Sequence, residues 1–352
     1  MPDLHEVPLA SPAWSRTAVE VQPTEFAGRR AVAFGDAVDL LAMVADVELT
    51  DGVVEIDMAV TGERAFHGVV WRVRDRQNYE SFYVRPHQVG NPDSIQYNPV
   101  FNDVAAWQLY HDEGFWAAVD FPIGAWFTVR VVFAGTRAEV FVGDLQTPAL
   151  VVAELKMPVA IGGIGILIGG PGLFVSRLAY SAAAFPFVAD PAHVPPPVPG
   201  IVPAWLVSDP FAEPEPAPMR IEPASLGPRR WIRLPAEASG LVNLAIASGI
   251  VDGRNTVFAR TTITSDASRI VALALGFSDR AVMYLNGVAL FRGDDTYRSR
   301  DYRFLGSIGW YDTIYLPLVE GANDLVIAVS ESFGGWGIQA RFDELAGLSI
   351  ST

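Results

Sequence analysis

The segment from Phe66 to His111 is the part of this chain whose residue types and spacing say most about chemistry. Arginine, glutamate, tyrosine, glutamine, tryptophan and three histidines follow one another along runs that alternate like β-strands. A guanidinium offers a rigid fork of hydrogen-bond donors, and a phenol joins a flat apolar face to a polar tip. Recognition of a sugar needs both kinds of group. The segment therefore predicts a saccharide-binding surface.

Alternation along two of these runs separates the side chains between the two faces of a sheet. Every second residue of a strand shares a face, so Val69, Trp71 and Val73 are expected to face the core. The residues expected on the opposite, concave face are Arg72, Tyr83, Arg85 and His87, with Gln96, Tyr97 and Asn98 on a loop at the rim and Gln108 and Tyr110 extending the surface. The alternative interpretation is an ordinary solvated face, because such faces carry arginine and tyrosine in any sandwich.

Glu80 shares the apolar face of its strand with Phe82 and Val84. One interpretation places it as a buried structural ion pair with Arg72 or Arg85. The other places it in a cleft, where a raised pKa would let it act as an acid or base. If the chain is an enzyme, Glu80 and His87 are the expected general acid and base, and the arginines would stabilise developing negative charge.

No metal site or cofactor is predicted from the spacing of potential ligands. The three histidines His67, His87 and His111 lie on separate strands without a metal-binding spacing, and cysteine is absent. Calcium is the one ion considered. The residues considered for a sugar or calcium site in the C-terminal half are Asp279, Asn286, Arg300, Asp301 and Trp336. For Asp279 and Asn286 the alternative is hydrogen bonding to turn backbones.

Short apolar runs with period-2 alternation and Gly, Asp, Asn or Pro between them fill both halves of the chain. This pattern is typical of all-β sandwiches. Twelve of the 26 prolines lie in 186–223, which predicts a semi-rigid connector. We therefore expect two β-sandwich, jelly-roll domains joined by a Pro-rich linker, with boundaries 1–185, 186–228 and 229–352.

Two stretches carry a resemblance to known folds. Residues 25–181 resemble the concanavalin A-like lectin/glucanase fold, and more narrowly its laminin G-like and 3-keto-disaccharide hydrolase domains. The matching positions are Gly52, Glu55, Asp57, Gly68, Arg72, Tyr79 and Glu80. Residues 229–350 resemble the galactose-binding-like jelly roll through Gly276-Phe277-Ser278-Asp279, Tyr284-Leu285-Asn286-Gly287 and Gly334-Gly335-Trp336-Gly337. Both resemblances imply sandwiches from lineages that handle glycans.

One departure limits what the first resemblance implies about activity. Glucanases of that fold use an E-x-D-x-x-E motif whose two glutamates serve as nucleophile and acid. Here Glu55 and Asp57 are followed by Met58, Ala59 and Val60, without a second glutamate. We therefore expect a carbohydrate-recognition protein. The alternatives are a glycoside hydrolase or lyase acting on glycosides or 3-keto-glycosides, and a structural or assembly subunit.

Charge and hydropathy narrow the expected partners to a saccharide. The formal charge of −15 would repel phosphates, which argues against nucleic acid and anionic membranes as partners. No window approaches the roughly 18 to 20 apolar residues of a membrane span. The start of the chain lacks a signal-peptide pattern, which predicts a cytoplasmic location, or secretion if a leader was trimmed. The residues leave the oligomeric state open.

Overall fold

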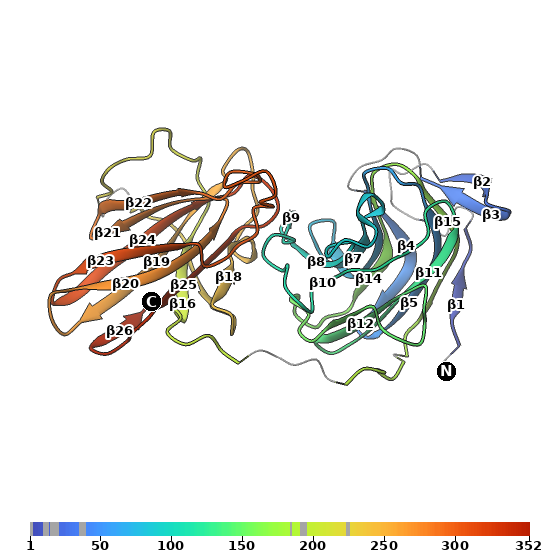
Figure 1. Ribbon diagram of the computed structural model, residues 1–352, viewed down its shortest axis with the longest axis horizontal. Coiled ribbons are helices and arrows are strands. Elements are labelled where there is room, and N and C mark those ends of the chain that lie inside the picture. Colours follow the sequence, from blue (N-terminus) through green and yellow to red (C-terminus); the bar gives the residue numbers. More distant parts are fainter. Residues whose placement is uncertain are drawn as a thin grey trace. The chain divides into compact units, whose positions relative to one another are not determined.

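The computed structural model describes residues 3–9, 14, 21–34, 40–183, 185–190, 196–222 and 226–352. The chain divides into two compact units. Unit 1 comprises 1–100 and 110–194, and unit 2 comprises 101–109 and 195–352. Both units are built from antiparallel strands, and the described residues contain no α-helix (Figure 1). The predicted all-β class is confirmed. None of the described helices is long and apolar enough to cross a bilayer.

Unit 1 has two sheets. One runs β13-β12-β11-β5-β15-β3-β2, with β1 beside β15, and the other runs β10-β8-β7-β6-β14-β4. The strands of the first are β1 (His5–Val7), β2 (Gln22–Phe26), β3 (Arg29–Ala33), β5 (Gly52–Val60), β11 (Trp126–Ala134), β12 (Arg137–Val142), β13 (Leu150–Val152) and β15 (Leu173–Ser181). Those of the second are β4 (Leu40–Leu49), β6 (Phe66–Asp75), β7 (Asn78–Val84), β8 (Ile95–Phe101), β10 (Trp116–Ala117) and β14 (Gly162–Gly169). The two-residue strand β9 (Val104–Ala105) lies in the segment 101–109 of unit 2.

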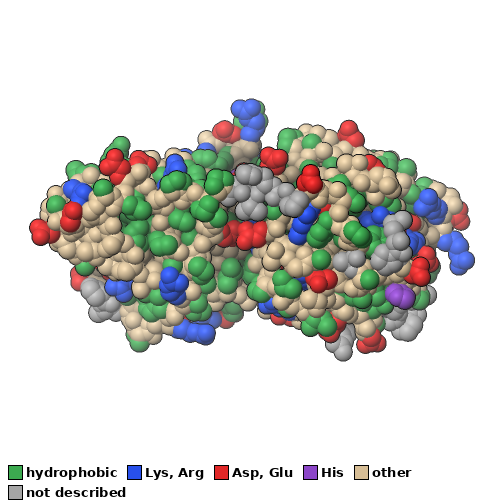
Figure 2. Space-filling view, turned by 90° about the horizontal axis from the view of Figure 1, so that it is seen from below, with side chains coloured by type: hydrophobic (Ala, Val, Ile, Leu, Met, Phe, Trp, Pro, Cys, Tyr) green, Lys and Arg blue, Asp and Glu red, His purple; other side chains and the backbone are tan. Residues whose placement is uncertain are grey.

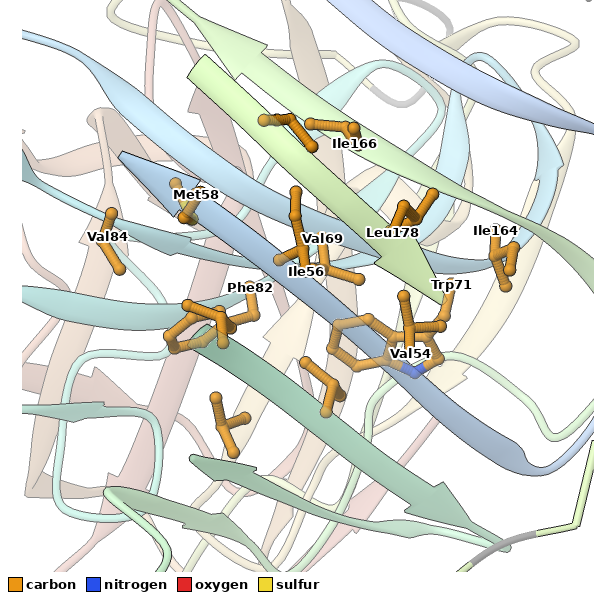
Figure 3. Packing of buried hydrophobic residues seen from close by; sticks show 14 of the residues in the cluster. Val54, Ile56, Met58, Val69, Trp71, Phe82, Val84, Ile164, Ile166 and Leu178 are labelled. Atoms are coloured by element: carbon orange, nitrogen blue, oxygen red, sulfur yellow. The ribbon is translucent and has the colours of Figure 1, made fainter. Parts of the chain in front are cut away.

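The core of unit 1 lies between these two sheets. Figure 3 shows Val54, Ile56 and Met58 of β5 facing Trp71 of β6 and Phe82 of β7. On β11 the alternation places Phe127, Val129, Val131 and Phe133 in the same core, as the sequence predicts. Burying such side chains contributes about 1.5–3 kcal/mol each, so this core is the main source of stability for unit 1.

Unit 2 also has two sheets. The larger runs β17-β16-β19-β24-β21-β22, with β26 beside β19, and the smaller runs β18-β25-β20-β23. The strands of the larger are β16 (Ala204–Ser208), β17 (Trp231–Pro235), β19 (Thr256–Ser265), β21 (Arg280–Leu285), β22 (Val288–Asp294), β24 (Gly321–Ser330) and β26 (Leu348–Ser351). Those of the smaller are β18 (Leu241–Asn243), β20 (Arg269–Ser278), β23 (Asp312–Leu318) and β25 (Gly337–Phe342).

The predicted Asn286-Gly287 turn between β21 and β22 is confirmed. Asn286 has φ 51° and Gly287 has φ 79°, the positive values that a tight type I′ turn requires. Two single turns of 3-10 helix complete the described elements, η1 (Pro86–Gln88) and η3 (Leu244–Ile246).

Two segments lie outside the domains to which the sequence assigned them. Strand β16 lies inside the predicted linker 186–228, where buried Trp205 packs into unit 2. Residues 191–195 and 223–225 of that linker are outside the described residues. Residues 101–109, expected in the first sandwich, belong to unit 2.

On the molecular face drawn in Figure 2, Lys and Arg side chains are scattered among Asp, Glu and hydrophobic ones.

Candidate functional site

A β-bulge at Arg72 breaks the alternation of β6. Arg72 has φ 48°, and the pairing of β6 with both β7 and β14 shifts register there. An extra residue in one strand turns the following side chains to the other face. Trp71 stays in the core, and Val73 joins the opposite face instead of the core face that we expected.

The bulge removes Arg72 from the expected concave face. Its side chain is 1% exposed and crosses to the sandwich edge, where Nε donates to the Thr50 carbonyl at 2.7 Å and Nη2 donates to the Gly135 carbonyl at 2.7 Å. Nη2 also lies 3.2 Å from Asp51 Oδ1, and the guanidinium lies over the Phe133 ring. Arg72 therefore links the turns at this end of the sandwich, and its predicted contact with a ligand is wrong.

Glu80 and Tyr97 lie together in the core of unit 1. The Tyr97 hydroxyl donates to Glu80 Oε2 at 2.5 Å, the Met157 backbone N–H donates to Oε1 at 3.1 Å, and the Lys156 backbone N–H donates to Tyr97 Oη at 2.8 Å. Burial raises the pKa of Glu80 to about 7, against the smaller opposing effect of these donors. Neither of the expected arginines forms an ion pair with it. Glu80 is fully buried, so its carboxyl does not face a ligand.

Tyr97→Phe tests this assignment. We expect it to lower the free energy of unfolding of unit 1 by about 1–3 kcal/mol, because Glu80 and the Lys156 N–H each lose a buried partner. Thermal unfolding followed by calorimetry measures the change. Tyr180→Phe, in the other sheet, is the control and should be near neutral. An equally stable Tyr97→Phe protein would contradict the role given to this hydroxyl.

The other face of β6 and β7, turned away from the core, carries an apolar patch beside a polar cluster. We call it the outer face. The patch consists of Val70, Tyr83 and Leu167 with Leu41, Met43, Phe66, Val73 and Tyr79 around them. Tyr79 and Tyr83 share this face while Phe82 and Val84 point into the core, as the alternation predicts. The outer face therefore has an apolar floor rather than an ordinary solvated surface.

Three buried polar side chains form what we call the Arg85 cluster: Tyr83, Arg85 and Gln96. Arg85 Nη2 donates to Gln96 Oε1 and, at 3.2 Å, to Tyr83 Oη. The Tyr83 hydroxyl donates to Gln96 Oε1 at 3.2 Å, and Gln96 Nε2 donates to the Tyr110 carbonyl at 2.7 Å. Arg85 Nη1 donates to the Asp93 carbonyl and lies 3.6 Å from its carboxylate. Burial raises the pKa of Tyr83, so the phenol is neutral.

His87 and Phe66 stand at the edge of this cluster and are partly exposed. Their rings meet edge to face with centroids 5.5 Å apart, and the Arg85 guanidinium lies 5.7 Å from the centre of the Phe66 ring. Burial, followed by the charges of Arg64 and Arg85, lowers the pKa of His87, so its imidazole is neutral near pH 7. Among the described residues Nδ1 is enclosed without a hydrogen-bond partner, which favours the tautomer with the proton on Nε2.

The remaining predicted site residues are placed as follows. Gln96, Tyr97 and Asn98 lie on strand β8, not on the loop that we expected. Asn98 is buried, and its carbonyl accepts from Ser81. Tyr110 is buried, with its ring centroid 5.3 Å from that of Phe115. Gln108 belongs to unit 2, where Nε2 donates to the Leu305 carbonyl at 2.7 Å, so its expected place on the ligand face is wrong.

The histidines considered in the sequence do not lie together. His67 points into the core, where Nε2 lies 3.0 Å from the Pro171 carbonyl and burial lowers its pKa to about 4. The aromatic residue that sequence reasoning passed over is Phe66. Its place on the outer face could have been predicted, because Phe66 precedes the bulge on β6 and alternates in step with Gly68 and Val70.

In unit 2, the residues considered for a sugar or calcium site form hydrogen bonds and ion pairs with other residues of the unit. Asp279 Oδ2 accepts from the Ser332 and Phe333 backbone N–H groups, and Trp336 Nε1 donates to the Val329 carbonyl. The Asn286 side chain donates to Asn323 Oδ1 and accepts from the Asp324 N–H. The Arg300 guanidinium donates to the carboxylates of Asp295 and Asp312. The Asp301 carboxylate accepts from the N–H groups of Arg303 and Phe304. The described residues hold no cluster of three or more His, Asp or Glu side chains suited to a metal ion.

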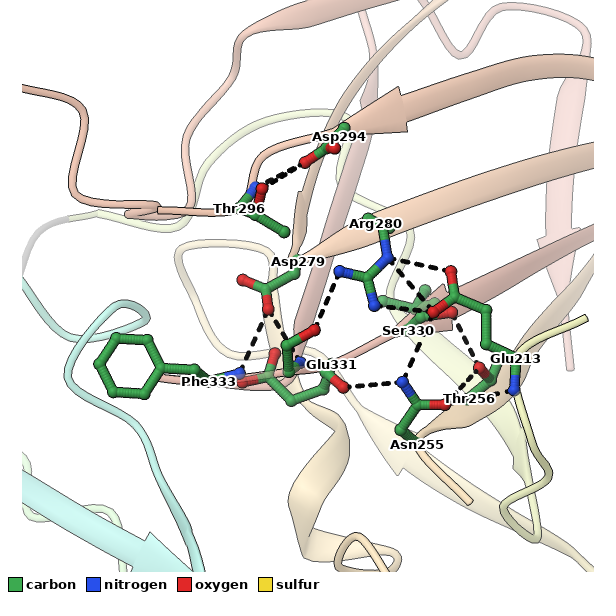
Figure 4. Close-up of polar contacts among 12 residues, drawn as sticks. Glu213, Asn255, Thr256, Asp279, Arg280, Asp294, Thr296, Ser330, Glu331 and Phe333 are labelled. Carbon is green, nitrogen blue, oxygen red and sulfur yellow. Dashed lines mark hydrogen bonds and ion pairs between the residues drawn. The ribbon is translucent and has the colours of Figure 1, made fainter. Parts of the chain in front are cut away.

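Asp279 belongs to a larger polar network beside β24 (Figure 4). Arg280 binds Glu213, with Nη2 to Oε2 at 2.7 Å. Glu331 is fully buried; Oε1 accepts from the Gly335 N–H at 3.0 Å, whereas Oε2 has no partner among the described residues. Burial and the nearby Asp279 charge raise the pKa of Glu331 to about 8. We infer that Glu331 holds the proton of this pair. Burial also raises the pKa of Asp279, against the opposing effect of its two backbone donors.

Comparisons with known proteins give distant structural matches. No protein-family model and no curated protein matches the chain. A carbohydrate-binding module from Bacillus subtilis is 11% identical, covering 47% of this chain and 89% of its own, with a TM-score of 0.33. A protein of unknown function with a galectin-like fold from Bacillus subtilis is 11% identical, covering 51% of this chain and 96% of its own, with a TM-score of 0.37. A putative glycosyl hydrolase from Parabacteroides distasonis is also 11% identical, covering 51% of this chain and 100% of its own, with a TM-score of 0.36. These values are too low to assign a family or an activity.

Proposed function

We propose that unit 1 is a carbohydrate-recognition module that binds a saccharide on the outer face, at Phe66 and His87. The observation that carries the proposal is a neutral imidazole beside a partly exposed aromatic ring, both standing on the Arg85 cluster. The Phe66 ring would stack on the C–H face of a sugar, and His87 Nε2–H would donate to a hydroxyl. The buried cluster would hold both rings in position.

Charge in this region favours a neutral ligand. Asp93 lies against Arg85 and offsets its charge, and Tyr83, Gln96 and His87 are uncharged. One exposed cation, Arg64, lies with its guanidinium 5.8 Å from the centre of the Phe66 ring. Sugar hydroxyls match such groups, because each can donate and accept hydrogen bonds at the same atom. An anionic sugar would have to approach a chain of formal charge −15.

We propose binding rather than bond cleavage because the candidate acid/base pair is split. Glu80 lies in the core, whereas His87 lies on the outer face. Hydrolysis with retention or inversion requires two carboxyl groups that both reach the glycosidic bond. Asp93 is the carboxylate beside Arg85 at the edge of the cluster, and the described contacts place no second carboxylate with it.

Binding to an array of immobilised neutral monosaccharides and oligosaccharides, followed by isothermal titration of each hit, tests the proposal. His87→Ala and Phe66→Ala are expected to weaken binding by about tenfold or more, since each removes a direct contact worth roughly 1–2 kcal/mol. Both side chains are partly exposed, so both variants should fold.

His5→Ala is the matched control, because His5 lies on β1 in the opposite sheet. It should bind like the unaltered protein. The proposal would be abandoned if no sugar on the array bound, or if His87→Ala and Phe66→Ala both titrated with unchanged affinity.

A further inference from the structure

One segment of unit 2, residues 209–222, runs across one face of its larger sheet, and we call it the strap. Its Phe211 and Ile221 pack in one apolar cluster with Phe258 of β19 and Tyr284 of β21. The Phe211 and Phe258 rings lie with their centroids 4.5 Å apart. The strap therefore covers apolar side chains of the sheet that would otherwise face water.

The end of the strap pairs with β22 through its backbone. The Ala289 N–H donates to the Met219 carbonyl at 3.0 Å, and the Ile221 N–H donates to the Gly287 carbonyl at 2.9 Å. These two bonds extend the sheet by a short stretch beyond β22. Their opening and closing report on whether the end of the strap is attached.

Arg292 of β22 reaches the same end of the strap with its side chain. Its Nη2 donates to the Ala217 carbonyl at 2.6 Å and to Met219 Sδ at 3.5 Å. A thioether is a weak acceptor, so the second contact contributes little to holding the strap. The guanidinium nevertheless places a charged donor next to the sulfur.

Met219 differs from the other described methionines in its exposure to solvent. It is 67% exposed, whereas Met58 and Met283 are fully buried and Met157 is 3% exposed. Met43 is half-buried. An oxidant must reach the sulfur to oxidise a thioether, so Met219 is the described methionine most open to this reaction.

We propose that Met219 is a site of reversible oxidation by peroxides, and that its sulfoxide fastens the strap to β22 through Arg292. In the reaction a sulfur lone pair attacks one oxygen of hydrogen peroxide and the O–O bond breaks. The proton on the transferred oxygen passes to the departing hydroxide, which leaves as water. The sulfur is oxidised by two electrons and the peroxide is reduced by two.

The expected effect on the fold is the reverse of the usual one. Oxidation of a buried methionine disrupts packing, because the sulfoxide is polar. Met219 has little packing to lose, since most of its side chain is in solvent. The new oxygen forms next to Arg292 Nη2 and is a far better acceptor than the sulfur. A charge-assisted hydrogen bond should replace a weak contact, and the end of the strap should open less often.

Limited treatment of the full chain with hydrogen peroxide, followed by peptide mapping with mass spectrometry, tests the modification. We expect Met219 to gain one oxygen at least about tenfold faster than the other described methionines, Met43, Met58, Met157 and Met283. Met1 lies outside the described residues and is followed on its own peptide.

Hydrogen exchange of the amides of Ile221 and Ala289 tests the effect on the strap. We expect both to exchange about fivefold more slowly in the oxidised chain. A methionine sulfoxide reductase should restore the original rates. Met219→Leu, treated with peroxide in the same way, should show no slowing.

Arg292→Ala separates the modification from its effect. In this variant Met219 should still be oxidised, but oxidation should no longer slow the two amides. Arg298→Ala, which removes another exposed arginine of unit 2, is the matched control and should respond like the unaltered chain. The proposal is overturned if a buried methionine is oxidised as fast as Met219. It is equally overturned if oxidation leaves exchange unchanged or faster, or if the slowing persists in Arg292→Ala.

Discussion

Replacing Arg72 with methionine is expected to lower the free energy of unfolding of unit 1 by about 3 kcal/mol or more, with glycan binding unchanged. Methionine fills part of the same volume but offers no donor. The carbonyls of Thr50 and Gly135 would lose their bonds, and Asp51 would lose its ion pair. Calorimetry of the unfolding transitions gives the stability, and titration with an array hit gives the affinity.

Arg74→Met is the matched control for this change. Arg74 is exposed and, among the described residues, donates to the Pro158 carbonyl at 3.0 Å, so its loss should cost no more than about 0.5 kcal/mol. A stable Arg72→Met protein that had lost its affinity would show that Arg72 serves the ligand, as the sequence suggested, and would refute its structural role.

The second large effect concerns the pH dependence of unit 2. The pKa of Glu331 is raised to about 8, so between about pH 5 and pH 8 the folded chain holds a proton that the unfolded chain has released. The stability from this group is complete at low pH and is lost as the pH rises through about 8. The unaltered protein should lose about 1.4 kcal/mol per pH unit in this window relative to Glu331→Gln.

Glutamine mimics the protonated acid and keeps the Oε1 acceptor for the Gly335 N–H. Chemical denaturation at several pH values, with exchange of backbone amides in β24 reporting on unit 2, measures the difference. Glu344→Gln, an exposed acid of the same unit, should leave the pH dependence as it is. If the free energy of unfolding changed with pH in the same way for Glu331→Gln and the unaltered chain, Glu331 would be ionised over the whole pH range, which would contradict the prediction.

Strand alternation predicted the parts of the fold that follow regular pairing. The sequence identified the core positions of β11 and the faces of β7, because nothing interrupts their period of two. The Asn286-Gly287 turn was readable for the same local reason, as few residue pairs accept two positive φ angles.

The candidate site was less predictable, because it depends on a bulge and on contacts distant in sequence. One extra residue at Arg72 reversed the parity of β6 and moved the leading candidate to the sandwich edge. Glu80 found Tyr97 and the Met157 N–H as partners, neither of which lies near it in the sequence.

The most direct test of saccharide recognition by unit 1 is a crystal structure of the chain with a neutral oligosaccharide that binds on the array. We expect a sugar ring against Phe66 and a hydroxyl within hydrogen-bonding distance of His87 Nε2, with the Arg85 cluster unmoved beneath them. A sugar bound anywhere else on unit 1, or an outer face left empty while the ligand occupies unit 2 alone, would contradict the account.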